Sequence, residues 1–326
     1  ITGDHKDTAV AIGMELGIIA DASQAITGSQ LDEISDEEFK KRITEFSVYA
    51  RVQPEHKVRI VNAWKANGMI TAMTGDGVND APSIKSADIG IGMGITGTDV
   101  TKNVADMVLA DDNFATIVSA VEEGRRIYAN MRKAIQFLLA SNLAEVLAIF
   151  IVAVLCCRFD FLLSAQVLWL NLVTDSFPVL ALGMERAEPD IMERKPKRAE
   201  KAVFSKESVL SMCFFGGAIT VITLAVFFVS LALFGNATAT TMPFFTLSFA
   251  ELFHAFNIRS DRQSVFRTGI FSNKALLLTV IGGIAVNIAV YAAAPLKAAL
   301  GIYALTVWQW VAVFMSALGV ITLGEI

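Results

Sequence analysis

The sequence contains only three cysteines among its 326 residues, and their positions exclude two common uses of cysteine. Cys156, Cys157 and Cys213 lie in or at the edge of apolar stretches. Their spacing matches no zinc-binding motif, and three cysteines do not make the even-numbered framework of a secreted disulfide protein. We therefore expect all three to be small core or lipid-facing residues.

Charged residues are also scarce, at 18% of the chain, and long stretches after residue 133 are nearly free of them. Hydrophobic residues make up 54% of the chain, and the mean hydropathy is +0.54. Such a chain is too apolar for an ordinary soluble protein of this length, so much of it must lie in lipid. The change in composition predicts a domain boundary near Lys133, between residues 1–133 and 134–326.

Six apolar stretches in the second part are candidates to cross a bilayer, whose core of about 30 Å requires roughly 20 helical residues. They are residues 134–157, 161–184, 208–234, 242–258, 275–296 and 302–323. The fourth is the weakest candidate because it is short and contains Glu251 and His254. If it did not span, every later helix would reverse its orientation.

The distribution of Lys and Arg favours six spans. These residues collect in two connections, at Arg186, Arg194, Lys195, Lys197, Arg198, Lys201 and Lys206, and at Arg259, Arg262, Arg267 and Lys274. Basic loops remain on the cytoplasmic side, so we expect both connections and residues 1–133 to be cytoplasmic. The first of them, from Arg186 to Lys206, is expected to be a solvated loop.

Residues 1–133 alternate short candidate strands with candidate helices. The pattern predicts helices at 7–16, 36–44, 54–67 and from Pro82, and strands at 47–50, 69–73, 89–92 and 107–109. Ile1-Thr2-Gly3-Asp4 has the pattern of the end of a buried strand. Alternating strands and helices predict a doubly wound parallel sheet.

Three polar segments follow candidate strands. They are Thr2-Gly3-Asp4, Lys57 after Pro54, and Thr74-Gly75-Asp76-Gly77-Val78-Asn79-Asp80. Doubly wound sheets bind ligands beyond the carboxyl ends of their strands. Gly75 permits close backbone approach, Asp76 and Asp80 offer hard oxygens suited to Mg²⁺, and Lys57 offers a compact cation for phosphoryl oxygens. Each segment alone is more often a turn or a solvated lysine, but together they predict a phosphate-handling site.

The stretch TGDGVNDAP at 74–82, followed by KSADIGIGM at 85–93, resembles the hinge signature of P-type ATPases, within the haloacid-dehalogenase superfamily. ITGD at 1–4 resembles the second motif of that superfamily, and VQPEHK at 52–57 resembles the third. The resemblance covers essentially the whole chain. It implies an α/β domain followed by an all-α membrane domain: part of a haloacid-dehalogenase-like phosphorylation domain at 1–133, then six transmembrane helices.

The resemblance also implies roles for individual residues. Thr2 and Gly3 would hold the phosphoryl group, Lys57 would neutralise its charge, Asp76 would bind Mg²⁺, and Asn79 and Asp80 would order that site. Positioned cations and amides of this kind are what phosphoryl transfer requires of a protein.

Three parts of the P-type ATPase pattern do not occur in the sequence. They are the D-K-T-G-T motif with its aspartyl nucleophile, the T-G-E motif, and the nucleotide-binding domain that would mainly bind ATP. We therefore expect a C-terminal fragment that alone forms no aspartyl phosphate and hydrolyses no ATP, and that works with the N-terminal remainder of the same pump.

Polar side chains inside the apolar stretches predict an ion site, because charges in lipid are costly and mark transport pathways. Three carboxylates lie well inside a stretch: Glu145, Asp175 and Glu251. Amide and hydroxyl side chains share their faces at helical spacing: Asn142, Asn171 and Thr174. Pro178 would free a backbone carbonyl nearby, whereas Asn287 and His254 are expected to tie or pack helices, with proton transfer as the alternative for His254.

These positions resemble the ligands of sarcoplasmic-reticulum-type calcium pumps, and calcium prefers six to eight oxygen ligands. The resemblance implies Ca²⁺ as the transported ion, Glu145 and Thr174 as first-site ligands, and a further Glu from a helix outside this chain. Export of Mn²⁺ or Na⁺ by a close relative is the alternative. We expect a multi-pass protein of the plasma membrane whose partners are lipid, the cation and the rest of the pump, with no nucleic acid.

Two other classes of function remain open from the residues. A membrane-anchored phosphatase of the same superfamily would need an aspartate nucleophile on its own strand, and none is evident before Thr2. A channel or scaffold would explain the apolar stretches but would leave the GDGVND stretch without a purpose.

Overall fold

A computed structural model describes residues 1–155, 161–194, 205–260 and 264–324. The chain divides into two compact units, Ile1–Ala120 and Val121–Ile326. The composition boundary expected near Lys133 lies inside one continuous helix, α7 (Phe114–Leu155). Cys156 and Cys157 lie outside the described residues, and Cys213 is an exposed free cysteine.

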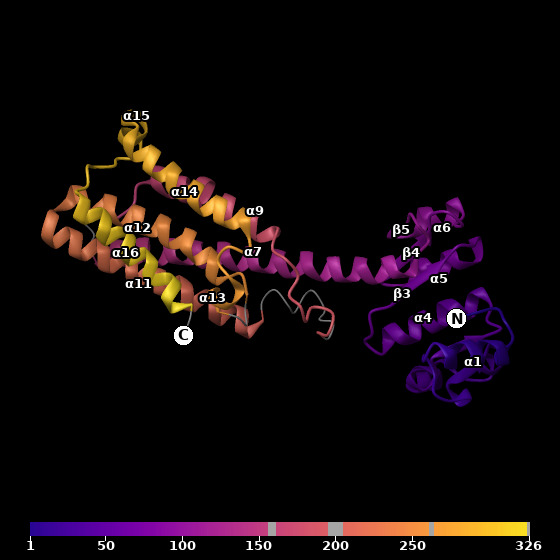
Figure 1. The fold of residues 1–326 in the computed structure, drawn as a ribbon. Helices are drawn as coiled ribbons and strands as arrows, with labels where there is room; N and C mark the ends of the chain where they lie inside the picture. The colour runs from indigo at the N-terminus through magenta and orange to yellow at the C-terminus, as the bar shows by residue number, and fades with distance from the viewer. Residues whose placement is uncertain (156–160, 195–204, 261–263, 325–326) are drawn as a thin grey trace. The chain divides into compact units, whose positions relative to one another are not determined.

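The first unit contains short helices and strands in alternation (Figure 1). Its helices are α1 (Lys6–Glu15), α2 (Gly28–Asp32), α3 (Asp36–Arg42), α4 (Pro54–Ala66), α5 (Ala81–Ser86) and α6 (Asp99–Val104), and its strands are β1 (Ala25–Thr27), β2 (Val48–Ala50), β3 (Ala72–Gly75), β4 (Ile89–Met93) and β5 (Met107–Leu109). The expected helices at 7–16, 36–44 and 54–67 are confirmed, as are the strands at 47–50, 89–92 and 107–109. The strand expected at 69–73 begins later, and β1, α2 and α6 were not predicted.

The strands form two parallel sheets in the described residues, where the sequence predicted a single doubly wound sheet. β1 pairs with β2, with Ala25 opposite Val48, and the other sheet has the order β3-β4-β5. The prediction of parallel strands is therefore confirmed, but the prediction of one continuous sheet is wrong. Alternating strands and helices determine the parallel direction, but they do not determine which strands become neighbours.

The start of the chain runs beside β2 without forming a strand, which corrects the expectation of a buried strand end. The Thr2 N–H donates to the Tyr49 carbonyl at 2.8 Å, and the Val52 N–H donates to the Thr2 carbonyl at 3.3 Å. Ile1 is 49% exposed. The segment is paired along one edge, and about half of the surface of Ile1 is exposed.

Helix α4 places its side chains in the cores beside both sheets. Ile60 packs with Ile26 of β1 and other buried residues on that side, whereas Val61 packs with Met73 of β3 and Ile84 of α5. Pro54 at its first turn is favourable because the missing N–H would have no helical partner there. The first turn of α4 is thereby held beside the segment that follows β3.

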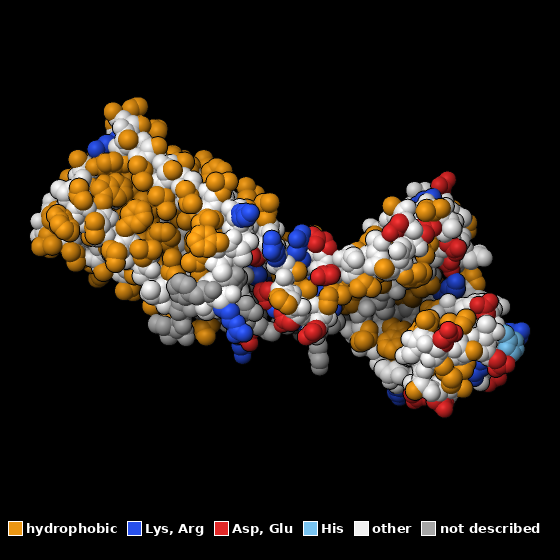
Figure 2. Space-filling view, in the orientation of Figure 1, with side chains coloured by type: hydrophobic (Ala, Val, Ile, Leu, Met, Phe, Trp, Pro, Cys, Tyr) orange, Lys and Arg blue, Asp and Glu red, His pale blue; other side chains and the backbone are white. Residues whose placement is uncertain are grey.

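The second unit is helical. Besides α7 it contains α8 (Ser164–Trp169), the π-helix η4 (Leu170–Thr174), α9 (Ser176–Gly183), α11 (Lys206–Phe234), α12 (Asn236–Asn257), α13 (Val265–Thr268), α14 (Lys274–Ala292), α15 (Ala294–Ala299) and α16 (Val307–Leu323). Hydrophobic side chains cover much of the helical unit in the face that Figure 2 shows. Such a surface suits lipid rather than water.

Four helices in the described residues are long and apolar enough to cross a membrane, where the sequence predicted six spans. They are Phe114–Leu155, Ser164–Gly183, Lys206–Phe234 and Lys274–Ala292. The sixth expected span corresponds to α16, which is apolar but has 17 residues.

The remaining expected span corresponds to α12, which is long but less apolar than the others. Its side chains from Thr241 to Phe256 are all buried, and it packs against α9, α11, α14 and α16. A helix enclosed by other helices needs no lipid-facing surface, so it tolerates Glu251 and His254.

Candidate functional site

Lys57 and Asp80 form an ion pair at the carboxyl end of β3. Lys57, in the first turn of α4, donates from Nζ to Oδ1 of Asp80. The Gly77 N–H donates to the other carboxylate oxygen of Asp80 at 3.4 Å. Asp80 is buried, so its position is determined on both sides, and the structure brings these two predicted residues together.

Gly75 provides the space for this arrangement. A Cβ atom at this position would overlap with the Cβ and Cγ atoms of Asp80. The requirement for glycine here is therefore steric and comes from the close approach of Asp80.

Asp76 is exposed and lies directly after β3. Its backbone carbonyl accepts hydrogen bonds from the Thr98 N–H at 2.9 Å and from the Thr101 hydroxyl at 3.4 Å. Both threonines belong to the start of α6, where the Thr98 side chain caps the helix. These two residues were not predicted from the sequence, although Thr98 followed by Asp99 is a helix-start signal.

Asp112 holds the loop that leads to Thr98. Its carboxylate accepts hydrogen bonds from the backbone N–H groups of Gly94, Ile95 and Thr96 at 2.6, 3.1 and 2.7 Å. Lost hydration acts to raise the pKa of Asp112, but these hydrogen bonds outweigh it and lower the pKa to about 2. The carboxylate is therefore ionised at neutral pH and fixes the loop.

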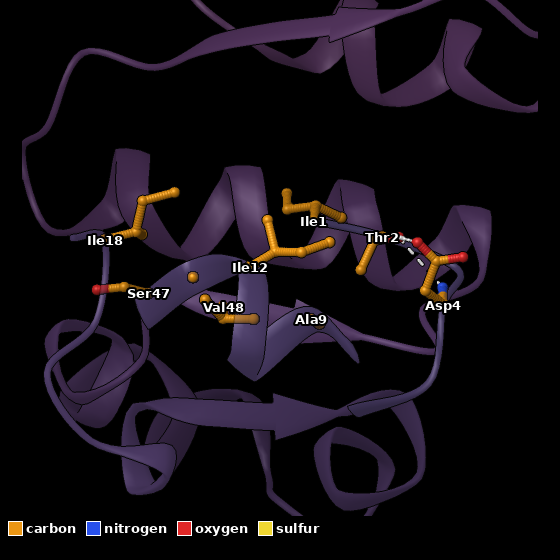
Figure 3. A pocket seen from close by; sticks show the side chains of 9 residues that line it. Ile1, Thr2, Asp4, Ala9, Ile12, Ile18, Ser47 and Val48 are labelled. Carbon is orange, nitrogen blue, oxygen red and sulfur yellow. Dashed lines mark hydrogen bonds between the residues drawn. The ribbon is translucent and has the colours of Figure 1, made fainter. Parts of the chain in front are cut away.

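Thr2 hydrogen-bonds within its own turn. Its hydroxyl donates to the Asp4 carboxylate at 2.8 Å and accepts from the Asp4 N–H at 3.1 Å (Figure 3). The cavity drawn in Figure 3, of about 180 Å³, is lined by Thr2 and Asp4 but not by Lys57, Asp76 or Asp80.

Gly3 and Asn79 are both exposed, Gly3 in the turn at the start of the chain and Asn79 in the short 3₁₀ helix Val78–Asp80. No group of three or more His, Cys, Asp or Glu side chains in the described ranges has the arrangement of a metal site. Asp76 is thus a single exposed carboxylate. It fits an ion such as Mg²⁺, which retains several waters and takes only one or two protein carboxylates.

The second group of predicted residues lies in the helical unit, where α7, η4 and α12 meet. The Asn171 amide donates to Oε2 of Glu145 at 2.8 Å, which joins η4 to α7. The hydroxyls of Thr174 and Ser248 lie 3.2 Å apart, which joins η4 to α12. The Asn142 amide donates to the Leu138 carbonyl of its own helix at 2.7 Å.

The three carboxylates of this group are buried and largely without hydrogen-bond partners. Within the described residues, no partner contacts Oε1 of Glu145, either oxygen of Asp175, or either oxygen of Glu251. Electrostatic interaction links Asp175 with Glu145, and Glu251 with both of them. Buried polar atoms without partners are costly, so these oxygens favour a positively charged ligand, although the three carboxylates do not lie in the arrangement of a preformed metal site.

The π-helix η4 interrupts the regular helix at this place. The Asp175 N–H donates to the Leu170 carbonyl at 3.0 Å, one residue further back than in an α-helix. Pro178 has no N–H to offer to Thr174, the residue four positions before it. A local π-helix of this kind often marks a functional site.

His254 is fully buried between two aromatic rings. Its ring centroid lies 6.0 Å from that of Phe137 and 4.6 Å from that of Phe215. Neither ring nitrogen has a hydrogen-bond partner in the described residues, which is consistent with the expected packing role. Asn287 ties helices as expected, because it accepts from Trp169 Nε1 at 3.3 Å.

The buried position of Arg259, in the second basic connection, was not predicted from the sequence. Arg259 is 2% exposed and pairs with Glu185, which is 6% exposed. Lys133, just before the first expected span, is also buried, and it pairs with Glu188 at 3.1 Å. The sequence gives no signal for these pairs, because a basic residue near a membrane helix is usually solvated.

Comparison with known proteins relates both units to described families. Residues 159–326 match the family "Cation transporting ATPase, C-terminus", and residues 1–88 match "haloacid dehalogenase-like hydrolase".

Three curated relatives illustrate the likeness. Calcium-transporting ATPase 1 of Bacillus cereus is 44% identical over 100% of this chain and 38% of its own length. Calcium-transporting ATPase of Bacillus subtilis is 44% identical over 98% of this chain and 36% of its own length. Calcium-transporting ATPase type 2C member 2 of Rattus norvegicus is 36% identical over 91% of this chain and 32% of its own length. The chain thus spans less than two fifths of the length of each of these relatives.

Proposed function

Because the chain belongs to the family of cation-transporting ATPases, we propose that it is the C-terminal part of a P-type pump that exports Ca²⁺. In this proposal the intact protein uses ATP, forms an aspartyl phosphate, and moves the ion across the plasma membrane. The observation that carries the proposal is the set of unpartnered, buried carboxylate oxygens on Glu145, Asp175 and Glu251.

The cation would bind where α7, η4 and α12 meet. Oxygen ligands on Glu145, Asp175 and Glu251 would be joined by the neighbouring side chains of Asn142, Asn171 and Thr174. Calcium suits such a set because it accepts many oxygen ligands in flexible geometry. The carboxylates repel one another when ionised, and a divalent cation between them removes that repulsion.

The π-helix η4 supports this assignment through the backbone. Irregular backbone at membrane depth is tolerated where it lines a cavity. Here the interruption falls between Asn171 and Asp175, so backbone carbonyls freed from regular pairing would lie among the proposed ligands.

The phosphoryl group would be handled by the first unit. Lys57 would neutralise charge on the phosphoryl oxygens, and Thr2 and Gly3 would contribute a hydroxyl and backbone amides beside it. Asp80 orients Lys57 through their ion pair, and Asn79 would help to order the same edge. Asp76 would hold Mg²⁺, which supplies further positive charge to the phosphoryl oxygens when bound.

The proposal also includes a membrane topology. We propose that α12 and α16 also cross the bilayer, as members of a six-helix bundle, with residues 1–133 in the cytoplasm. α12 is enclosed by other helices, so its lower hydropathy is compatible with a membrane position.

Two substitutions in the intact pump test the cation site. Asp175→Asn should raise the calcium concentration for half-maximal ATPase activation by about tenfold or more, because calcium affinity depends strongly on the number of charged ligands. Glu251→Gln should have a smaller effect, because Glu251 would contribute from one side only. Calcium-activation curves of ATPase turnover provide the measurement, with Asn287→Ala as a control at a buried polar residue outside the site.

Equal or reversed effects of the two substitutions would contradict the ranking of the ligands. Unchanged curves for both would show that these carboxylates only tie helices together. If Na⁺ or Mn²⁺ activates ATPase turnover and Ca²⁺ does not, the transported ion is Na⁺ or Mn²⁺ and not Ca²⁺.

A further inference from the structure

A buried ion pair lies just beyond the proposed cation site, at the ends of the helices that carry it. Nε and Nη2 of Arg259 donate to the two carboxylate oxygens of Glu185, each at 2.9 Å. The Asn273 amide donates to the same carboxylate at 2.8 Å. We call these three residues, Glu185, Arg259 and Asn273, the latch.

The latch connects the ends of three helices, and the backbone of Glu185 joins it to the interior of a fourth. Glu185 follows α9, Arg259 follows α12, and Asn273 caps α14 by accepting a hydrogen bond from the Leu276 N–H at 2.9 Å. The backbone carbonyl of Glu185 accepts from Asn130 of α7 at 2.8 Å. The proposed ligands lie on or next to three of these helices, α7, α9 and α12.

The remaining bonds of the latch reduce the freedom of its side chains. Arg259 also donates to the Gly269 carbonyl at 2.7 Å and to the Ser272 hydroxyl at 2.5 Å. Asn273 also donates to the Ala181 carbonyl of α9 at 3.2 Å. A planar guanidinium used in this way has a fixed geometry that a lysine cannot reproduce.

The electrostatics of Glu185 agree with this geometry. Burial acts to raise the pKa of Glu185, but the hydrogen bonds from Arg259 and Asn273, with the Arg259 charge, outweigh it and hold the pKa below its usual range. The carboxylate is therefore ionised at neutral pH, and the pair is fully formed.

The cation site itself offers little to hold α9 and α12 together without an ion. Its carboxylates repel one another, and the hydroxyl pair of Thr174 and Ser248 is a weak tie. A charged, buried and fully hydrogen-bonded contact is much stiffer. The spacing of the two helices must therefore be set outside the site.

We propose that Glu185, Arg259 and Asn273 are positioning residues that hold α9 and α12 at the spacing the cation site requires. The inference rests on the proposed function of that site, and it assigns to the latch the pre-organisation of the site before the ion arrives. Breaking the latch should weaken cation binding and leave the chemistry of a loaded pump intact.

The test uses the intact pump with the substitutions Glu185→Gln, Arg259→Gln and the two combined. Each single change should raise the calcium concentration for half-maximal activation by about tenfold, within the usual range for coupling between sites. The rate of phosphoenzyme formation from ATP at saturating calcium should remain unchanged. The double variant should be impaired less than the sum of the two singles, because it leaves no unpaired buried charge.

Matched controls make the same chemical changes at exposed positions. Glu207→Gln in the first turn of α11 and Arg267→Gln in α13 replace exposed residues, and they should leave the calcium dependence unchanged. Arg259→Lys keeps the charge but loses the paired hydrogen bonds, so it offers a variant that folds more readily. It should show an intermediate shift in the calcium requirement.

Several outcomes would overturn the proposal. An unchanged calcium requirement in Arg259→Lys and Glu185→Gln would do so, as would an equal loss of phosphorylation at saturating calcium. Strict additivity in the double variant would show that the two residues do not act as a unit. Absence of calcium activation in the unmodified pump would instead contradict the proposed function, so the two failures are distinguishable.

Discussion

Gly75 and Asp80 show at the scale of single residues how the phosphate edge is assembled. Asp80 comes so close to the backbone of β3 that a side chain at position 75 would overlap with it. The Asp80 carboxylate in turn receives Lys57 from α4 and the Gly77 N–H from its own turn. A small change at Gly75 should therefore displace Asp80 and, through their ion pair, Lys57 on α4.

Gly75→Ala should lower the rate of phosphoenzyme formation in the intact pump by about a hundredfold, the usual effect of an error of about 1 Å in a reacting geometry. The added methyl group should displace Asp80 and release Lys57. Rapid-quench measurement of phosphoenzyme formation from labelled ATP provides the test.

The control for this substitution is Gly124→Ala in α7, where an added Cβ would meet nothing within 4 Å. It should leave the rate unchanged and slightly favour the helix. A Gly75→Ala pump with the unmodified rate would show that Asp80 and Lys57 do not position the phosphoryl group.

Among helices and strands, the sequence predicted those with a strong local signal. The spacing of apolar residues and the Pro54 turn predicted α4 and its neighbours, and the GDGVND stretch correctly marked the edge where Lys57 and Asp80 meet. The pairing of strands into two sheets could not be predicted, because it depends on contacts between distant segments.

Two features of the helical unit also could not be predicted from the sequence. The buried pair of Glu185 and Arg259 was not foreseen, since positive charge near a membrane helix has an ordinary explanation in solvation. The π-helix η4 was not foreseen either, although Pro178 indicated a disturbed backbone. Both features result from the packing of helices that are far apart in the chain.

The interruption of the helix at η4 leads to a prediction about Pro178. Pro178→Ala restores an N–H that can bond to the Thr174 carbonyl, so it should favour a regular helix and move Asp175. The calcium concentration for half-maximal activation of the intact pump should rise severalfold, as measured by ATPase activity.

Pro295→Ala is the matched control for Pro178→Ala. Pro295 lies in the first turn of α15, where a proline interrupts no helical hydrogen bond. This variant should behave as the unmodified pump. If Pro178→Ala leaves the calcium dependence unchanged as well, the irregular backbone does not shape the cation site.

For the whole molecule, the residues proposed to handle phosphate and the residues proposed to bind the cation lie in different units. The phosphate-handling residues belong to Ile1–Ala120, and the buried carboxylates belong to Val121–Ile326. α7 runs without interruption from Phe114 to Leu155 and carries Glu145. This helix contains residues of both units and therefore joins them through its backbone.

Calcium uptake into sealed inside-out vesicles that contain the intact protein tests the central claim most directly. With ATP and Mg²⁺ outside, we expect Ca²⁺ to accumulate inside. A calcium ionophore should release it, and Asp76→Asn should abolish the accumulation. Asp76→Asn should act in this way because an amide is a much weaker ligand for Mg²⁺ than a carboxylate. ATP hydrolysis without calcium accumulation, or accumulation that persists in Asp76→Asn, would contradict the account.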